Sequence, residues 1–125
     1  MLQIAPDNSV DAKPFDGDED KMVCAQCGTF VTRRAWEMPI DGRSEHFCVN
    51  PLGIEFRVLS FSEAPGAKAV GPARTEASWF GGYAWRLSLC VSCGSHLGWR
   101  YEQVGGGGLF FGLIHEALSE QSTDS

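Results

Sequence analysis

The sequence predicts an all-β domain. Short runs in which apolar and polar residues alternate fill the centre of the chain, and glycine, proline and asparagine interrupt them. Alternation with a period of two is typical of strands with one buried face, and no long stretch shows the 3.6-residue period of a helix. A length of 125 residues with 43% hydrophobic residues suits a single domain with one core. We therefore expect antiparallel strands joined by short turns.

Three runs show the alternation most clearly, and each is expected to place its apolar members on one face of a sheet. They are Ile54, Phe56 and Val58; Trp85, Leu87 and Leu89; and Leu97, Trp99 and Tyr101. The glycines at 105–108 predict a flexible turn that leads to a last strand at about 109–114. A short helical turn is expected near 115–118.

The two ends differ in composition from the centre. Residues 1–20 are acidic and polar, so they bury too little apolar area to order themselves and are predicted to form a disordered tail. Residues 119–125 are similarly polar and are expected to fray. The folded domain is therefore expected to span 21–118.

The charge of the chain excludes several classes of partner. A formal charge of -6 and a pI near 4.9 argue against nucleic acid and anionic membranes, because both require clustered Lys and Arg. The N-terminus lacks the pattern of a signal peptide, and no apolar run is long enough to span a bilayer. We expect a cytoplasmic protein, whose paired cysteines hold metal more often than they form disulfides.

Two Cys-x-x-Cys-Gly motifs predict a metal site. Cys24 and Cys27 form the first pair, and Cys90 and Cys93 form the second. A tight turn of this kind points two thiolates at one ion, so two turns complete a tetrahedron of the kind that zinc prefers. Redox-active pairs or two unrelated pairs are the alternatives. Because four thiolates leave no open position, we expect one structural Zn²⁺ per chain.

Three tryptophans flank the second cysteine pair. Trp79 and Trp85 precede it across a glycine turn, and Trp99 follows it. The strands that enter and leave the turn are neighbours in a hairpin, and Tyr101 shares the face of Trp99. The rings can either form plain core or enclose a ligand as an aromatic cage, and their positions alone leave both options open.

The run from 76 to 101, E-A-S-W-F-G-G-Y-A-W-R-L-S-L-C-V-S-C-G-S-H-L-G-W-R-Y, resembles the CULT family, typified by the thalidomide-binding domain of cereblon. The first cysteine pair and Asn50-Pro51-x-Gly53 match further landmarks. The resemblance implies a stand-alone bacterial member with a β-tent fold, in which two antiparallel sheets lean together and a zinc ion pins the apex. It also implies a glutarimide pocket walled by Trp79, Trp85 and Trp99, with Tyr101 at its base and Asn50, Pro51 and Phe56 beside it.

Such a pocket suits a cyclic imide, which has an apolar face for indole rings and a polar edge that needs backbone partners. We expect the extended segment Ala77-Ser78-Trp79 to supply a carbonyl and an N–H. Animal members of the family carry His at the position of Ala77, so only main chain is available here. Candidate ligands are glutarimide-type (thalidomide-like) molecules, uracil- or uridine-like nucleosides and cyclic-imide peptide ends. No catalytic residue is expected.

Two other functions remain as alternatives. Methionine sulfoxide reductase B also has paired zinc knuckles, and Cys48 would be its nucleophile, although Cys48 precedes the second pair and a lone thiol of this kind is more often buried core. A cage for a quaternary ammonium such as methyl-lysine would need an acid at the rim, for which Glu76 is the candidate. Among the histidines, His96 is expected to be a hydrogen-bonded structural residue.

Overall fold

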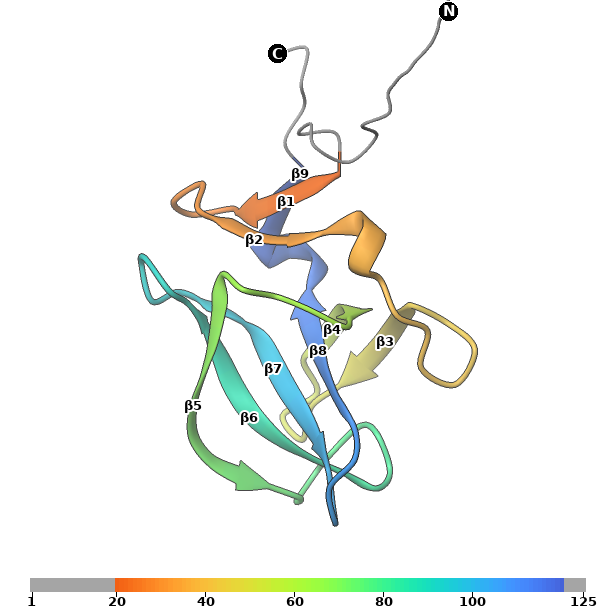
Figure 1. Cartoon of the computed structure of the whole chain (residues 1–125). Helices are drawn as coiled ribbons and strands as arrows, with labels where there is room; N and C mark the ends of the chain where they lie inside the picture. The colour runs from red at the N-terminus through yellow and green to blue at the C-terminus, as the bar shows by residue number, and fades with distance from the viewer. Residues whose placement is uncertain (1–19, 121–125) are drawn as a thin grey trace, which may run out of the picture.

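The computed structural model describes residues 20–120, and it confirms the all-β prediction. Within these residues, nine strands form two antiparallel sheets, and two short 3₁₀ turns complete the ordered elements (Figure 1). No helix in this part of the chain could cross a membrane. The predicted disordered tail, except Asp20, and residues 121–125 of the predicted frayed end lie outside the described residues.

The smaller sheet has the order β2-β1-β9, with β1 at Lys21–Cys24, β2 at Phe30–Arg33 and β9 at Leu118–Glu120. Strand β9 pairs with β1 from Cys24↔Leu118 to Met22↔Glu120. The ordered chain thus continues through the first two residues that were expected to fray. The polar side chains of these residues remain exposed, while their backbone groups pair with β1 and Leu118 is buried.

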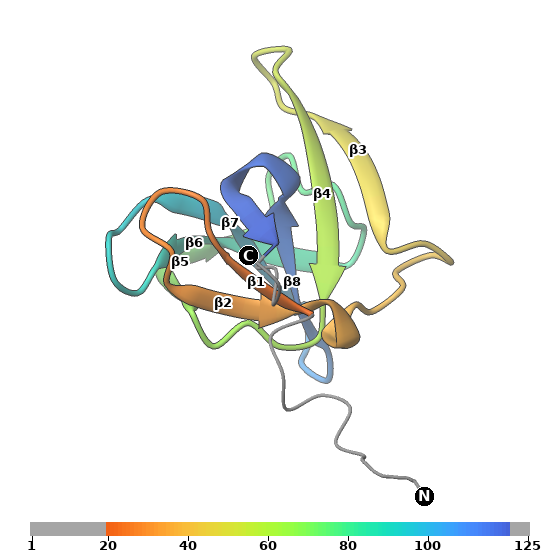
Figure 2. The same cartoon turned by 90° about the horizontal axis from the view of Figure 1, so that it is seen from above.

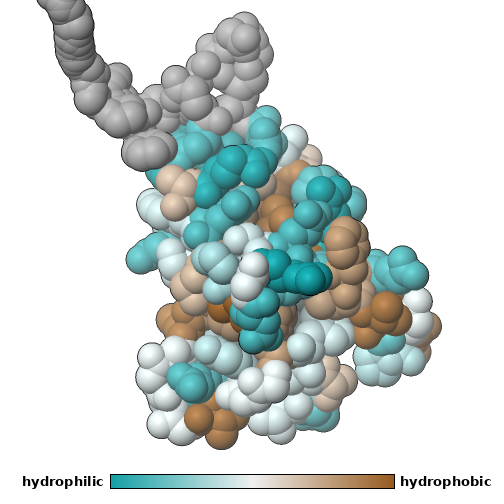
Figure 3. Space-filling model, turned by 90° about the vertical axis from the view of Figure 1, so that its right-hand side faces the viewer, coloured by the Kyte–Doolittle hydropathy of each residue, from teal (hydrophilic) through white to brown (hydrophobic). Residues whose placement is uncertain are grey.

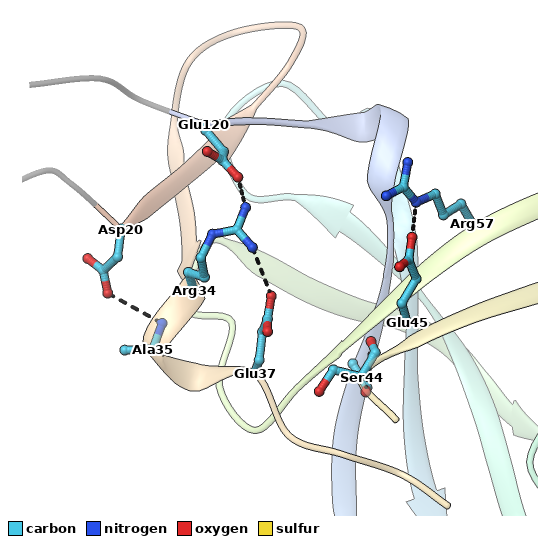
Figure 4. Close-up of polar contacts among 9 residues, drawn as sticks. Asp20, Arg34, Ala35, Glu37, Ser44, Glu45, Arg57 and Glu120 are labelled. Carbon is cyan, nitrogen blue, oxygen red and sulfur yellow. Dashed lines mark hydrogen bonds and ion pairs between the residues drawn. The ribbon is translucent and has the colours of Figure 1, made fainter. Parts of the chain in front are cut away.

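Side-chain contacts strengthen this end of the molecule. Asp20, which was assigned to the tail, forms an ion pair with Arg33 at 2.8 Å and accepts a hydrogen bond from the Ala35 N–H. Arg34, in the 3₁₀ turn η1 (Arg34–Trp36), pairs with both Glu37 and Glu120 (Figure 4). The exposed Arg34 pairs contribute little each, about 0 to 1 kcal/mol, but they connect η1 to β9.

The larger sheet has the order β3-β4-β8-β7-β6-β5, and every neighbouring pair is antiparallel. Its strands are β3 (Glu45–Val49), β4 (Glu55–Phe61), β5 (Ala67–Arg74), β6 (Tyr83–Cys90), β7 (His96–Gln103) and β8 (Leu109–Ile114). The last strand of this sheet therefore matches its predicted range. The 3₁₀ turn η2 (His115–Ala117) then leads to β9. It lies where a short helical turn was expected, near 115–118.

The two sheets lean together over a common core. Buried residues from the small sheet, among them Met22 and Val31, pack with Phe61, Leu97 and Leu113 from the large sheet. The turn between β1 and β2 lies beside the turn between β6 and β7 in both views (Figure 1, Figure 2). The sheets therefore meet where the two cysteine motifs were predicted to converge, as in the expected tent.

A bulge in β7 places Leu97 on a different face of the sheet from the one predicted. Ser88 pairs with Gly98, but the next partner of Leu89 is His96, so Leu97 has no partner in β6. Leu97 therefore packs in the core between the sheets, whereas Trp99 and Tyr101 belong to a second cluster on the opposite face. The expectation that Leu97 shares a face with these two rings is wrong, because period-two alternation fails wherever an extra residue is inserted.

Candidate functional sites: a cysteine cluster and an aromatic pocket

The four predicted cysteine ligands lie together. The Sγ atoms of Cys24, Cys27, Cys90 and Cys93 are all within 4.8 Å of one another, and no other group of three or more His, Cys, Asp or Glu in the described part could hold a metal. Two of the distances, Cys24–Cys93 at 3.7 Å and Cys27–Cys90 at 3.6 Å, are close to the ~3.8 Å expected between sulfurs of a tetrahedral zinc site. The arrangement could therefore hold a metal ion.

The two turns have the same local structure. The Gly28 N–H donates to the Cys24 carbonyl, and the Gly94 N–H donates to the Cys90 carbonyl. Both glycines have positive φ, 81° and 78°, which favours glycine at these positions. The repeated Cys-x-x-Cys-Gly spacing thus produces two matching turns, each with two thiols aimed at the shared centre.

A hydroxyl residue follows each glycine and contacts a cysteine sulfur. Thr29 Oγ1 lies 3.1 Å from Cys27 Sγ, and Ser95 Oγ lies 3.0 Å from Cys93 Sγ and 3.4 Å from Cys24 Sγ. Burial raises the pKa of Cys24, but hydrogen bonds from Ser95 and nearby backbone outweigh this and lower it to about 6. The thiolate form of Cys24, which is the form that binds metal, is therefore favoured.

The predicted aromatic residues line one pocket of about 180 Å³ on the large sheet. Its lining residues are Asn50, Pro51, Ala77, Trp79, Trp85, Trp99 and Tyr101. In the hairpin of β6 and β7, Trp85 is opposite Tyr101, and Leu87 is opposite Trp99, so the rings share one face. Seven of the nine residues predicted to bind ligand thus lie around the same space, although their role in binding remains a prediction.

The pocket walls are held by their own indole groups. The Trp79 Nε1–H donates to the Val49 carbonyl at 2.9 Å, and the Trp85 Nε1–H donates to the Glu76 carbonyl at 2.8 Å. Trp79 and Trp99 stand nearly perpendicular, with ring centroids 4.9 Å apart. Because the indole N–H groups of Trp79 and Trp85 have backbone partners, these two rings present mainly their apolar faces to the pocket.

Tyr101 forms the floor. Its ring stacks on Phe110 at 4.9 Å and meets Phe80 edge-on at 4.8 Å, and the residue is only 1% exposed. Burial, with a smaller effect from Cys48, raises the pKa of its hydroxyl well above the usual range. Tyr101 therefore stays neutral at physiological pH.

Asn50 shapes the wall that the β3–β4 hairpin contributes. Its Oδ1 accepts hydrogen bonds from the N–H groups of Leu52 and Ile54, both at 2.9 Å. Pro51 follows it, and the Gly53 N–H closes the turn on the Asn50 carbonyl at 2.9 Å. Asn50 is thus a turn-forming residue whose position beside the pocket follows from the hairpin.

The 77–79 loop differs from the predicted extended segment. Ala77 has a φ of 58°, a left-handed conformation that is costly for a residue with a Cβ, so the expectation of an extended Ala77 is wrong. The Ser78 hydroxyl lies 2.8 Å from the Tyr83 carbonyl oxygen and 3.0 Å from the Phe80 carbonyl oxygen, so its one hydrogen is donated within this loop. Within residues 20–120, neither the Ala77 carbonyl nor the Trp79 backbone N–H has a hydrogen-bond partner. The pair predicted to face a ligand is therefore available.

Two predicted residues do not line the pocket. Phe56 packs behind the walls, 5.4 Å from Trp99 and 5.8 Å from Trp79 between centroids. Ser78 is occupied within its own loop, as described above. Both therefore support the pocket from outside.

His96 is a supporting residue whose contact with a wall the sequence did not reveal. Its Nε2 lies 3.0 Å from the Gly98 carbonyl, and its ring meets Trp99 edge-on with 5.0 Å between centroids. The bulge at Leu97 creates this arrangement, and sequence alternation gives no sign of it. The prediction of a hydrogen-bonded structural histidine is confirmed.

The pocket lining contains no charged side chain among the described residues. Glu76, the candidate acid for an ammonium cage, is exposed and forms an ion pair with Arg74 at 3.1 Å. The hydrogen bond to its own backbone N–H and the contact with Arg74 lower the pKa of Glu76. The pocket therefore suits an uncharged ligand.

Cys48 is buried in β3, as predicted, at 8% exposure. Burial raises the pKa of its thiol, so it is protonated near neutral pH and is a poor nucleophile. His46 in the same strand lies 3.4 Å from Ser60 Oγ and meets Phe80 edge-on.

Fold and sites together define a two-sheet β domain with a four-cysteine cluster at the meeting point of the sheets and a separate aromatic pocket. No family model matches the chain. The chain is 46% identical to cereblon of Drosophila willistoni over 111 residues, which cover 81% of the chain and 18% of that protein. It is 37% identical to cereblon of Danio rerio over 89 residues (63% and 21%) and 43% identical to cereblon of Xenopus tropicalis over 56 residues (45% and 12%).

These similarities show that the chain contains a cereblon-like domain. The chain spans only about an eighth to a fifth of the length of these relatives. The predicted resemblance of this domain to part of cereblon is therefore confirmed.

Proposed function

We propose that this domain is a non-enzymatic binding module for cyclic imides. One observation carries the proposal. The Ala77 carbonyl and the Trp79 N–H have no hydrogen-bond partners within residues 20–120, and they belong to the loop beside an uncharged pocket lined by tryptophan. In this proposal the domain is of the CULT type, as in bacterial single-domain members, and it acts in the cytoplasm without nucleic acid or membrane as a partner.

An imide complements these groups. Its N–H donates to the Ala77 carbonyl, and one of its carbonyls accepts from the Trp79 N–H. Both backbone groups otherwise lose hydrogen bonds to water when a ligand fills the pocket, which costs about 1 to 3 kcal/mol for each unsatisfied group. The methylene face of the ring packs on the indoles, where burial contributes about 25 cal/mol per Å². Trp79, Trp85 and Trp99 thus act as an aromatic cage.

The size of the pocket limits the ligand to a single ring. Its volume of about 180 Å³ is below the roughly 300 Å³ at which pockets for drug-sized ligands begin. Glutarimide itself, the glutarimide ring of a thalidomide-like molecule and the base of uracil or uridine all present an imide edge and fit this limit. A cyclic-imide peptide end is a further candidate, with its chain outside the pocket.

We also propose that the cysteine cluster holds one Zn²⁺ with a structural role. Four sulfur ligands fill a tetrahedral site, so the ion has no open position for chemistry. Bound there, zinc would join the β1–β2 turn to the β6–β7 turn. The second turn connects the strands that carry Trp85 and Trp99, so the ion would fix the hairpin on which the pocket is built.

The two alternatives lack support in the site. A reductase needs a reactive thiolate, whereas burial keeps Cys48 protonated and the other four cysteines are gathered in the cluster. An ammonium cage benefits from an acid at the rim, whereas Glu76 is paired with Arg74. A neutral imide is the ligand that these observations favour.

Titration followed by tryptophan fluorescence tests the proposal. Glutarimide, succinimide, uracil and uridine are compared with N-methylglutarimide, which keeps the ring but lacks the donor, and with tetramethylammonium. We expect glutarimide to bind with a Kd of about 1 to 100 µM, since small ligands reach high binding free energy per heavy atom. N-methylglutarimide should bind at least about tenfold more weakly. Unchanged emission with all imides, or stronger binding of tetramethylammonium, would refute the proposal.

A further inference from the structure

Strand β3 is an edge of the large sheet, and several of its backbone groups have no hydrogen-bond partner within residues 20–120. The Ser60 N–H donates to the Ser44 carbonyl, and the Asn50 N–H donates to the Ile54 carbonyl. In an antiparallel pair the hydrogen-bonded positions recur every second residue, so the even-numbered residues of β3 bond to β4. The backbone groups of Glu45, Phe47 and Val49 therefore point away from the sheet. Of these groups, the Val49 carbonyl accepts a hydrogen bond from the Trp79 indole N–H.

This edge lacks two features that interrupt strand pairing at the opposite edge. The opposite edge, β5, contains Gly71 and Pro72, and its register with β6 is interrupted between Val70 and Arg74. Strand β3 has neither feature, and its outer face carries Phe47 at 76% exposure and Val49 at 54%. Figure 2 shows β3 at the outside of the molecule. Figure 3 views this side and shows apolar surface next to strongly hydrophilic surface. An exposed, regular edge is a site where another strand can pair.

A groove of about 530 Å³ runs beside this edge and is rich in arginine. Its lining includes Arg34, Arg43, Arg57, Glu37, Glu45 and Phe47. Both acids are already paired, Glu37 with Arg34 and Glu45 with Arg57 (Figure 4). Within residues 20–120, no acid forms an ion pair with the exposed Arg43. A cation that forms no ion pair with a described acid thus stands next to this strand edge, in a chain with a formal charge of -6.

We propose that β3 binds an extended acidic peptide of a partner protein as an additional strand. Backbone groups of the peptide pair with Glu45 and Phe47, and acidic side chains on the groove face lie against Arg43. Pairing of this type draws affinity from the main chain and specificity from alternate side chains. A second copy of the chain fits less well, because pairing two β3 strands centred on Phe47 would place Pro51 opposite Arg43 and would supply no carboxylate.

Fluorescence anisotropy with a short labelled peptide that alternates acidic residues with valine tests this site. Three changes should each weaken binding by at least about tenfold: replacing the acids with Asn and Gln, N-methylating alternate backbone amides, and the variant Arg43→Glu. The matched control Lys68→Glu changes the net charge equally at an exposed position of β5 and should bind like the parent protein. Unchanged melting temperature and imide binding show that Arg43→Glu is folded.

Several results would overturn the proposal. They are no binding of the acidic peptide, equal binding of the amide or N-methylated peptide, and equal affinity of Arg43→Glu and Lys68→Glu. A dimer in sedimentation velocity that the peptide cannot dissociate would assign the edge to a second copy and would also overturn it.

Discussion

Substituting Gly98 with Ala tests how the fold positions the pocket. Gly98 lies directly after the bulged Leu97, between this core residue and Trp99 in the pocket wall. An added Cβ would lie 2.2 Å from the Gly112 carbonyl oxygen and 2.8 Å from the Leu113 Cα. Both neighbours are backbone atoms of β8, so neither can move aside as a flexible side chain could.

The size of the effect follows from two costs. Overpacking of this kind typically costs about 1 to 3 kcal/mol. The φ of 155° adds a conformational cost of about 1 to 3 kcal/mol for a residue with a Cβ. We expect the free energy of unfolding to fall by about 3 kcal/mol or more, which lowers Tm by about 12 to 24 °C for a domain of this size. Trp99, the next residue, should shift, and imide binding should weaken.

Thermal unfolding followed by circular dichroism measures the change, with Gly81→Ala as the control. A Cβ added at Gly81 would meet no atom within 4 Å, so this substitution should leave Tm within about 2 °C of the parent. If Gly98→Ala has the same Tm as Gly81→Ala and binds imides normally, the bulge does not position Trp99 and the reasoning fails.

Three further predictions concern the pocket, the buried thiol and the metal. Trp99→Ala should weaken glutarimide binding by about 30-fold or more, which is the loss typical of a central Trp contact, and the variant should stay folded and keep its metal. The control Trp36→Ala removes an indole outside the pocket and should retain affinity. Equal loss of affinity in both variants would contradict the cage. Burial raises the pKa of Cys48 above its ordinary value of 9.0, so the unfolded chain loses this proton first. The stability that this shift contributes is present below pH 9 and is lost as the pH rises through the folded-state pKa, with a slope of at most about 1.4 kcal/mol per pH unit. Denaturant titrations from pH 8 to 10.5 should show a smaller slope in Cys48→Ala, and an unchanged slope would count against the buried neutral thiol. Chelation should unfold the domain and abolish imide binding, with recovery when zinc is added back; a chelated protein that keeps its Tm would show that the ion is dispensable.

The sequence could predict the features that depend on spacing. Repeated Cys-x-x-Cys-Gly turns require two thiols on one side, so the approach of Cys24 to Cys90 could be predicted without coordinates. The positions of Trp85 and Trp99 on either side of the second turn placed both rings on one face of a hairpin. In each case a local rule acts over a few residues.

The features that the sequence could not predict depend on contacts between distant segments. Strand β9 forms because β1 offers a free edge to Leu118 and the two residues after it, although their side chains are polar. The left-handed Ala77 lies in a loop whose Glu76 carbonyl accepts the Trp85 indole N–H. The bulge at Leu97 accompanies the close packing of Gly98 against strand β8. The alternation of residues within β7 contains no sign of this contact.

The most direct test of the proposed imide site is the Trp79 backbone amide in a ¹⁵N-labelled sample titrated with glutarimide. Its hydrogen is predicted to pass from solvent to an imide carbonyl, so its proton resonance should move downfield and its exchange with water should slow. The indole N–H of Trp36 should not change. Saturating glutarimide that leaves the Trp79 amide unmoved, while other resonances shift, would contradict the account.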